Sequence, residues 1–251
     1  MKLALVTGTN SVAAWAYNGW RGILEGAVND ADVIEEALKK RGYSVTKLVD
    51  GEVNIGRFKK EVHLLTKKAT KGDVVWITFS GHGAQAPGNE RDGYDESLCL
   101  FNGQIFDNEI HVLLSKFKRY VNVILFIDAC HSGTIYRGDG MKIKAAPVWA
   151  VKTRPRMNDR PRIVCNLAVL SGAADDKFSY DGAILKIKQP NNTYRVTKNG
   201  YFTKALVLSL DDRLFKTINN IKHSMPKFQK PVFTFLAKFL DRIKLKYFTK
   251  L

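Results

Sequence analysis

A histidine and a cysteine each follow directly after an apolar run, about fifty residues apart in the chain. The first run ends in Ser80-Gly81-His82-Gly83 and the second in Asp128-Ala129-Cys130-His131-Ser132-Gly133. A thiol is mostly protonated at neutral pH, so it needs a neighbouring base to attack a carbonyl carbon. An imidazole can take that proton and later give it to a leaving amine. We therefore predict that His82 and Cys130 form the dyad of a cysteine hydrolase.

The groups around this dyad suggest its further parts. The backbone N–H groups of Gly83 and Cys130 are candidate donors to a developing oxyanion. Residues two apart in a strand point the same way, so Asp128 leans toward Cys130 and Ser80 toward His82. Because a desolvated carboxylate favours a cationic partner, the site is expected to select Lys or Arg in a substrate.

Other interpretations of the same residues stay open at this point. A lone buried cysteine usually packs as a small hydrophobe, and a lone histidine is usually structural. His131 adjoins the nucleophile in sequence, so we expect it to point elsewhere. A zinc site built from Cys130, His131 and His82 would lack a convincing fourth ligand.

Strands alternate with helices along the chain, which predicts an α/β sandwich with a mostly parallel sheet. His82 and Cys130 then fall at the carboxyl ends of strands, where such sheets hold active sites. The predicted strands are 3–7, 44–49, 74–79, 121–127 and 167–171, with a hairpin over 98–106. The predicted helices are 29–41, 54–70, 107–118 (capped by Asp107), 201–210 and 213–223. Residues 10–24 and 86–96 are expected to be loops.

Length and composition fit one large globular domain of 251 residues with 45% hydrophobic content. No apolar stretch approaches a membrane span, and the first apolar run is too short for a signal peptide. Three scattered cysteines favour a reducing, cytoplasmic location over a disulfide framework. The net charge of +16 attracts acidic partners, so a nucleic-acid-binding protein is an alternative, although no readout motif accompanies the charge.

The two boxes resemble the catalytic boxes of the metacaspase and orthocaspase branch of caspase-like cysteine peptidases. Five further stretches resemble other landmarks of that family: 24–31, 92–96, 170–173, 200–203 and 229–231. The resemblance implies a caspase-like three-layer α/β/α sandwich and an endopeptidase that cleaves after Arg or Lys rather than after Asp. It places Asp30, Ser80 and Asp128 in the pocket for the side chain of P1, the residue before the cleaved bond. The box around Cys130 lacks the true-caspase pattern, which argues against aspartate specificity.

Many eukaryotic members of this family need calcium, and the resemblance suggests Asp92, Asp95 and Asp107 as possible ligands. Asn108 stands where a second adjacent Asp is expected, and Arg137 stands where an acidic ligand would help. A hard-cation site weakens when it loses carboxylates. We therefore expect an enzyme that requires no cofactor, as in orthocaspases.

The same resemblance divides the single domain 1–251 into a large-subunit-like part (1–136), an irregular basic linker (137–162) and a small-subunit-like part (163–251). An exposed basic loop suits a Lys/Arg-directed enzyme, so self-cleavage within 142–162 is one hypothesis, and a tolerated surface insertion is the other. Residues 233–251 are expected to form a packed terminal helix, with a membrane-binding or partner-binding helix as the alternative. We expect a monomer that acts on proteins or peptides; a catalytically silent adaptor is the alternative.

Overall fold

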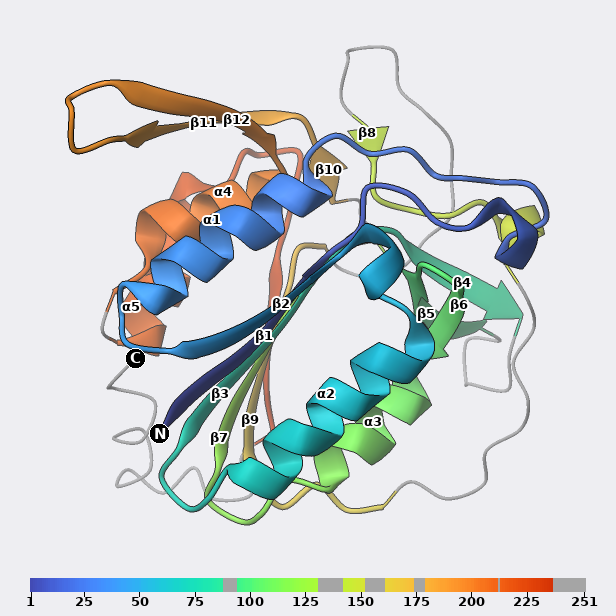
Figure 1. Cartoon of the computed structure of the whole chain (residues 1–251), viewed down its shortest axis with the longest axis horizontal. Helices are drawn as coiled ribbons and strands as arrows, with labels where there is room; N and C mark the ends of the chain where they lie inside the picture. The colour runs from blue at the N-terminus through green and yellow to red at the C-terminus, as the bar shows by residue number, and fades with distance from the viewer. Residues whose placement is uncertain (88–93, 131–141, 152–160, 174–178, 212, 237–251) are drawn as a thin grey trace.

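A six-stranded sheet forms the centre of the molecule in the computed structural model, which describes residues 1–87, 94–130, 142–151, 161–173, 179–211 and 213–236 (Figure 1). The strand order is β13-β9-β7-β3-β1-β2, and every pair is parallel except β13 with β9. The strands are β1 (Lys2–Gly8), β2 (Ser44–Val49), β3 (Val74–Ser80), β7 (Asn122–Asp128), β9 (Asn166–Ser171) and β13 (Val232–Leu236). The predicted, mostly parallel sheet is confirmed.

Helices cover both faces of this sheet, so the three-layer α/β/α sandwich is confirmed as well (Figure 1). One face carries α1 (Ala27–Lys39), α4 (Tyr201–Ser209) and α5 (Leu214–Ser224), and the other carries α2 (Ile55–Lys68) and α3 (Asp107–Ser115). Asn54 caps α2, where its side chain accepts a hydrogen bond from the Arg57 N–H. Among the described residues, no helix is long and apolar enough to cross a membrane.

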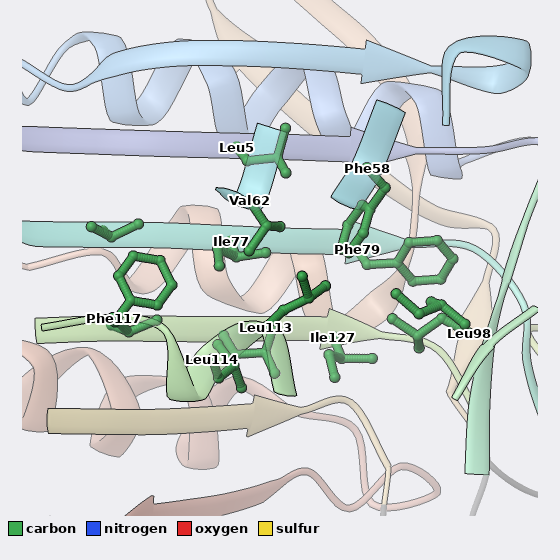
Figure 2. Packing of buried hydrophobic residues seen from close by; sticks show 14 of the residues in the cluster. Leu5, Phe58, Val62, Ile77, Phe79, Leu98, Leu113, Leu114, Phe117 and Ile127 are labelled. Atoms are coloured by element: carbon green, nitrogen blue, oxygen red, sulfur yellow. The ribbon is translucent and has the colours of Figure 1, made fainter. Parts of the chain in front are cut away.

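Two hydrophobic clusters join the helices to the sheet. In Figure 2, Phe58 and Val62 of α2 and Leu113 of α3 point toward sheet residues such as Ile77 and Ile127. On the opposite face, the ring of Phe202 from α4 stacks on Phe126 of β7, with ring centroids 4.5 Å apart. Strands β3 and β7 are buried along their whole length, and burial on both faces explains their continuous apolar sequences.

A third, smaller cluster lies beside the layers, and we call it the lateral cluster. Its buried members are Val12, Ala13, Ala16, Tyr17, Ala84, Cys99, Ala146 and Ala150. The first four come from the loop after β1, which contains the short helix η1 (Ala14–Ala16), and the last comes from the short helix η3 (Val148–Ala150). The lateral cluster therefore holds part of the basic linker against the N-terminal loop.

Three small antiparallel sheets accompany the main sheet (Figure 1). They are β4 (Gly83–Pro87) with β5 (Tyr94–Leu100) and β6 (Gly103–Phe106), β8 (Lys142–Ile143) with β10 (Tyr180–Asp181), and β11 (Ala183–Lys188) with β12 (Tyr194–Asn199). The hairpin predicted over 98–106 is confirmed as β5–β6. The loop predicted over 86–96 is partly wrong, because β4 continues to Pro87 and β5 begins at Tyr94, each satisfying the other's backbone groups.

Two expectations about element ends are also wrong. Asp107 is the first residue of α3 instead of its cap, and the helix ends at Ser115; the cap position belongs to Phe106, whose N–H donates to the Glu109 side chain. Phe233 and Phe235 lie on strand β13 and not on a terminal helix, because β13 pairs with the edge of β9 and both rings pack into the core. The rest of the predicted tail, 237–251, lies outside the described residues.

Candidate active site

The carboxyl ends of β3 and β7 lie side by side, since Ser80 pairs in register with Asp128. His82 and Cys130 each follow two residues after these partners, and both are buried, with 4% and 0% of their surface exposed. Gly83 must be a glycine, because a Cβ there would lie 1.8 Å from the Cys130 carbonyl oxygen. The structure thus brings the predicted histidine, cysteine and oxyanion donors together at one edge of the sheet.

A lysine of the basic linker occupies the space between these strand ends. The Lys144 carbonyl oxygen accepts hydrogen bonds from the backbone N–H groups of Gly83 and Cys130, each with an N···O distance of 3.0 Å. These are the two groups that the sequence suggested as oxyanion donors. The chain beyond Lys144 is also held, because Ala145 forms a bridge with Gly83 and the Ala146 N–H donates to the Gly83 carbonyl over 2.8 Å.

The side chain of Lys144 is fully buried and ends against all three residues expected to line the P1 pocket. Its Nζ lies 2.8 Å from Asp30 Oδ2, 3.2 Å from Asp128 Oδ2 and 2.7 Å from Ser80 Oγ. The Ser80 hydroxyl donates in turn to Asp30 over 2.5 Å. One ammonium group is therefore surrounded by two buried carboxylates and a hydroxyl.

Uncharged donors hold the two carboxylates in place. Asp30 Oδ1 accepts hydrogen bonds from the Asn199 side chain and the Gly200 N–H, both at 2.9 Å. Asp128 Oδ2 accepts from the Thr203 hydroxyl at 2.7 Å and the Thr203 N–H at 3.1 Å. Gly200 forms the wall of the pocket, since a Cβ there would lie 2.1 Å from Asp128 Oδ2. From the sequence alone, no role was assigned to Asn199, Gly200 or Thr203. The resemblance of residues 200–203 to the family was the one feature of the sequence that pointed to this region.

Ser179 connects the nucleophile to the pocket. Its hydroxyl donates to Asp128 over 2.5 Å, and its backbone N–H lies 2.7 Å from Cys130 Sγ. Gln229 supports it by donating to Ser179 Oγ over 2.9 Å and to the Gly172 carbonyl over 2.8 Å. Ser179 was not predicted from the sequence, because it belongs to an irregular stretch without a helical or strand pattern.

Charges in the pocket compensate one another. Burial raises the pKa of Asp30 to about 6; the Lys144 ammonium opposes this effect, and the Asp128 carboxylate adds to it. Burial disfavours the Lys144 ammonium too, but the carboxylates of Asp128, Asp30 and Asp181 together raise its pKa above the ordinary value. Removing the cation would leave buried negative charge without a partner.

A carbonyl group and an indole ring fix the imidazole of His82. Its Nε2 lies 2.8 Å from the Gly22 carbonyl oxygen, and the Trp20 ring contacts it edge-on with centroids 4.7 Å apart. Burial lowers the pKa of His82 to about 4, although the Gly22 carbonyl partly offsets this. The ring is thus neutral at pH 7 and carries its proton on Nε2. Its Nδ1 is buried and makes no hydrogen bond of good geometry in the described part of the chain, although the Ala145 backbone also interacts with the ring.

The thiol of Cys130 is also neutral while Lys144 is in place. Burial raises its pKa to about 12, the Ser179 hydrogen bond lowers it, and the Asp128 charge raises it again. Cys130 is therefore a thiol and His82 a neutral imidazole, and the two are not a thiolate–imidazolium pair. Water entry would reduce the desolvation that causes both shifts.

The acidic residues considered for calcium do not fit a metal site as far as the structure describes them. Asp95 is buried on β5 and Asp107 begins α3, while Asp92 lies outside the described residues. Within the described ranges, no three or more His, Cys, Asp or Glu side chains form a group that could hold a metal ion. His131, considered for zinc, also lies outside the described residues.

Comparisons with known proteins agree with this fold. The Peptidase_C14 family model, described as the caspase domain, matches residues 1–237. Metacaspase-1 of Plasmodium falciparum is 26% identical over 235 residues, which are 85% of this chain and 35% of that protein. Metacaspase-1 of Mycosarcoma maydis is 31% identical over 148 residues, which are 52% of this chain and 35% of that protein. The chain thus spans about a third of the length of these relatives.

A solved structure is similar over the full length. The crystal structure of protein GSU0716 from Geobacter sulfurreducens matches with a TM-score of 0.79 and 27% identity, covering 100% of this chain and 97% of that one. Since the family model also spans all but the last residues, the chain belongs to the caspase-domain family of peptidases.

Proposed function

We propose that this protein is a cysteine endopeptidase that cleaves after Lys or Arg, with His82 and Cys130 as its dyad. The observation that carries the proposal is Lys144, whose ammonium meets the Asp30 and Asp128 carboxylates while its carbonyl oxygen accepts from two N–H groups. A P1 residue needs both contacts at once, a pocket for its side chain and donors that polarise its carbonyl. Lys144 is bound as a P1 residue would be.

The proposed reaction assigns a step to each of these groups. Nδ1 of His82 takes the proton of the Cys130 thiol as Sγ attacks the P1 carbonyl carbon. The N–H groups of Gly83 and Cys130 stabilise the negative charge that develops on the carbonyl oxygen. His82 protonates the leaving amine, and the C–N bond breaks to leave a thioester on Cys130. Water, deprotonated by the same imidazole, then releases the P1 carboxylate and restores the thiol.

The charge of the pocket supports specificity for a basic residue. The buried carboxylates of Asp30 and Asp128 are compensated only while a cation lies between them, whereas an aspartate at P1 would add a third negative charge. Arginine offers the same charge on a planar group with more donors. Loss of one partner of a buried charged pair weakens binding by about 2–5 kcal/mol, or roughly 30-fold to 4,000-fold.

The same arrangement supports self-processing and suggests which bond is cut. In the linker segment 142–151, Lys144 takes the P1 position, so the bond cut in cis is Lys144–Ala145. Until that bond is cut or the segment moves, the linker excludes other peptides from the site. We therefore propose that the intact chain is at rest and that its first substrate is its own linker.

Fluorogenic peptides that differ only at P1 test the proposal. Wild type should cleave Lys and Arg peptides but not Asp or Gln peptides, and Cys130→Ala should cleave none. Asp128→Asn should lose at least about 30-fold in kcat/KM for the Lys peptide. Asp211→Asn, which changes a half-buried carboxylate paired with Lys216 and outside the candidate site, is the matched control. Turnover should be equal with calcium and with chelator.

Mass spectrometry tests the self-cleavage separately. Wild type should yield a fragment that begins at Ala145, and Cys130→Ala should stay intact. If no peptide is turned over in a Cys130-dependent way, even by a chain cut after Lys144, the protein is not this peptidase. Turnover of the Asp peptide alone would refute the pocket assignment.

A further inference from the structure

We propose that Asp181 forms a second acidic subsite, which selects Lys or Arg at P3, two residues before the cleaved bond. This inference rests on the proposed function and narrows its substrates to peptides with a basic residue at both P1 and P3. It concerns a different side chain from the three that surround the Lys144 ammonium.

The register of the linker against β10 places P3 opposite Asp181. The Lys144 N–H donates to the Ser179 carbonyl over 3.1 Å. Continuing along the antiparallel pair of β8 and β10, Ile143 lies opposite Tyr180 and Lys142 lies opposite Asp181. With Lys144 as P1, the positions P2 and P3 therefore pair with Tyr180 and Asp181.

The position of Lys144 shows which face of the β8–β10 pair is turned toward the P1 pocket. Lys144 and Ser179 lie opposite each other, and both side chains reach the Asp128 carboxylate, over 3.2 Å and 2.5 Å. Side chains of opposed residues project from the same face of an antiparallel pair, and so do those two residues apart. A P3 side chain and the Asp181 side chain consequently share the face that holds the P1 pocket, while P2 projects to the other face with Tyr180.

Asp181 has the chemistry that a cationic P3 side chain needs. Only 1% of its surface is exposed. Its Oδ2 accepts from the backbone N–H groups of Glu25 and Gly26, at 2.9 Å and 3.0 Å. Its Oδ1 is buried and has no hydrogen-bond partner within the described ranges. A buried carboxylate oxygen with unused accepting capacity favours an ammonium or guanidinium donor.

The neighbouring charges leave room for such a cation. The Asp181 carboxylate contributes to the raised pKa of Lys144, so it acts in the same field as the P1 pocket. Lys198 interacts electrostatically with Asp181, but its side chain is exposed and its ammonium binds Glu25 over 2.6 Å. Because Lys198 compensates Glu25, the Asp181 carboxylate is the negative charge that a P3 lysine or arginine would meet.

Two peptides with P1 fixed as Lys test the subsite, one with Lys and one with Ala at P3. Wild type should show at least a tenfold higher kcat/KM for the Lys–X–Lys peptide. Asp181→Asn keeps an oxygen that can accept from the Glu25 and Gly26 N–H groups but removes the charge. It should bring the P3 ratio close to one while a clear preference for Lys over Gln at P1 remains, because Asp30 and Asp128 keep their charges. Asp211→Asn should keep both ratios.

A series on wild type alone, with Lys, Ala or Glu at P3, keeps the test independent of how the variant folds. The expected order of kcat/KM is Lys, then Ala, then Glu. Equal rates for the three peptides, with Cys130-dependent turnover, would overturn the subsite and leave the proposed function standing. An absence of turnover for every Lys and Arg peptide would instead count against the proposed function.

Discussion

Replacing Lys144 with methionine keeps most of the side-chain volume and removes the cation that faces Asp30 and Asp128. Both carboxylates and the Lys144 side chain are 0% exposed, so water does not screen this charge. Removing one partner of a buried ion pair costs about 3–5 kcal/mol. Burial already raises the pKa of Asp30 to about 6, so Asp30 can take up a proton when the cation is removed. This proton uptake limits the loss of stability. At about 2–4 °C per kcal/mol for a domain of this size, Tm should fall by roughly 6–20 °C.

The measurement is thermal unfolding of Lys144→Met and Lys144→Arg, both in a Cys130→Ala background so that self-cleavage does not contribute. Lys144→Arg preserves the charge and should remain within a few degrees of its parent. Agmatine, which carries a guanidinium group, should raise the Tm of Lys144→Met more than that of the parent, because a ligand that binds only the folded state stabilises it.

The segment 142–151 could instead detach in Lys144→Met and let water reach the carboxylates. The loss of stability would then be smaller, but the site would be open, and the variant with an intact Cys130 should cleave a Lys peptide faster than wild type. A variant with both Tm and peptide turnover unchanged would refute the inference that Lys144 compensates the pocket and blocks it.

Three further outcomes are expected. Burial holds the pKa of His82 at about 4, below its ordinary 6.5, so the stability contributed by the neutral ring is complete above pH 6.5 and is lost as the pH falls toward 4. Glutamine does not titrate, so the free energy of unfolding of His82→Gln, measured in urea, should fall by up to about 3 kcal/mol less than that of wild type between pH 7 and pH 4. An equal fall in the two proteins would contradict the burial of the ring. Trp20→Ala removes the aromatic contact on His82 and should lower kcat by roughly 2–10-fold at unchanged KM, whereas the exposed Trp15→Ala should have no effect. With a pKa of about 12, the Cys130 thiol should react with iodoacetamide at pH 7 roughly 10³-fold more slowly in the folded chain than in urea. Mass spectrometry measures both rates of alkylation, and similar rates would show that the linker does not cover the thiol.

The dyad side of the site could be predicted because it depends on local sequence. Continuous apolar runs identified β3 and β7, and the alternation of side chains along a strand led to Ser80 and Asp128. The predicted helix that carries Asp30 also exists, although only the family resemblance connected that residue to the pocket. Its contact with Ser80 depends on how closely α1 packs on β1, where a Cβ at Gly8 would lie 2.1 Å from the Ala27 carbonyl oxygen.

The parts that were missed depend on contacts between distant segments. Lys144 was one basic linker residue among several, and its burial follows from hydrogen bonds to Gly83, Cys130 and Ser179, which lie far away in sequence. Strand β10 has two residues, too few for any periodicity to reveal. Strand β13 was mistaken for part of a helix, because Phe233 and Phe235 acquire their strand geometry only from pairing with β9.

The lateral cluster has a consequence for the proposed cut after Lys144. Ala146 and Ala150 are buried in it, and Asn18 donates a hydrogen bond to the Trp149 carbonyl over 2.8 Å. The fragment that starts at Ala145 would therefore stay in place, with its new amine beside the thioester. Held at that position, the amine can attack the thioester and re-form the peptide bond in competition with water. The rate at which the active site opens would then depend on how fast Ala146 and Ala150 leave their packing near Val12 and Tyr17. The dyad would determine only how often the peptide bond breaks and forms again.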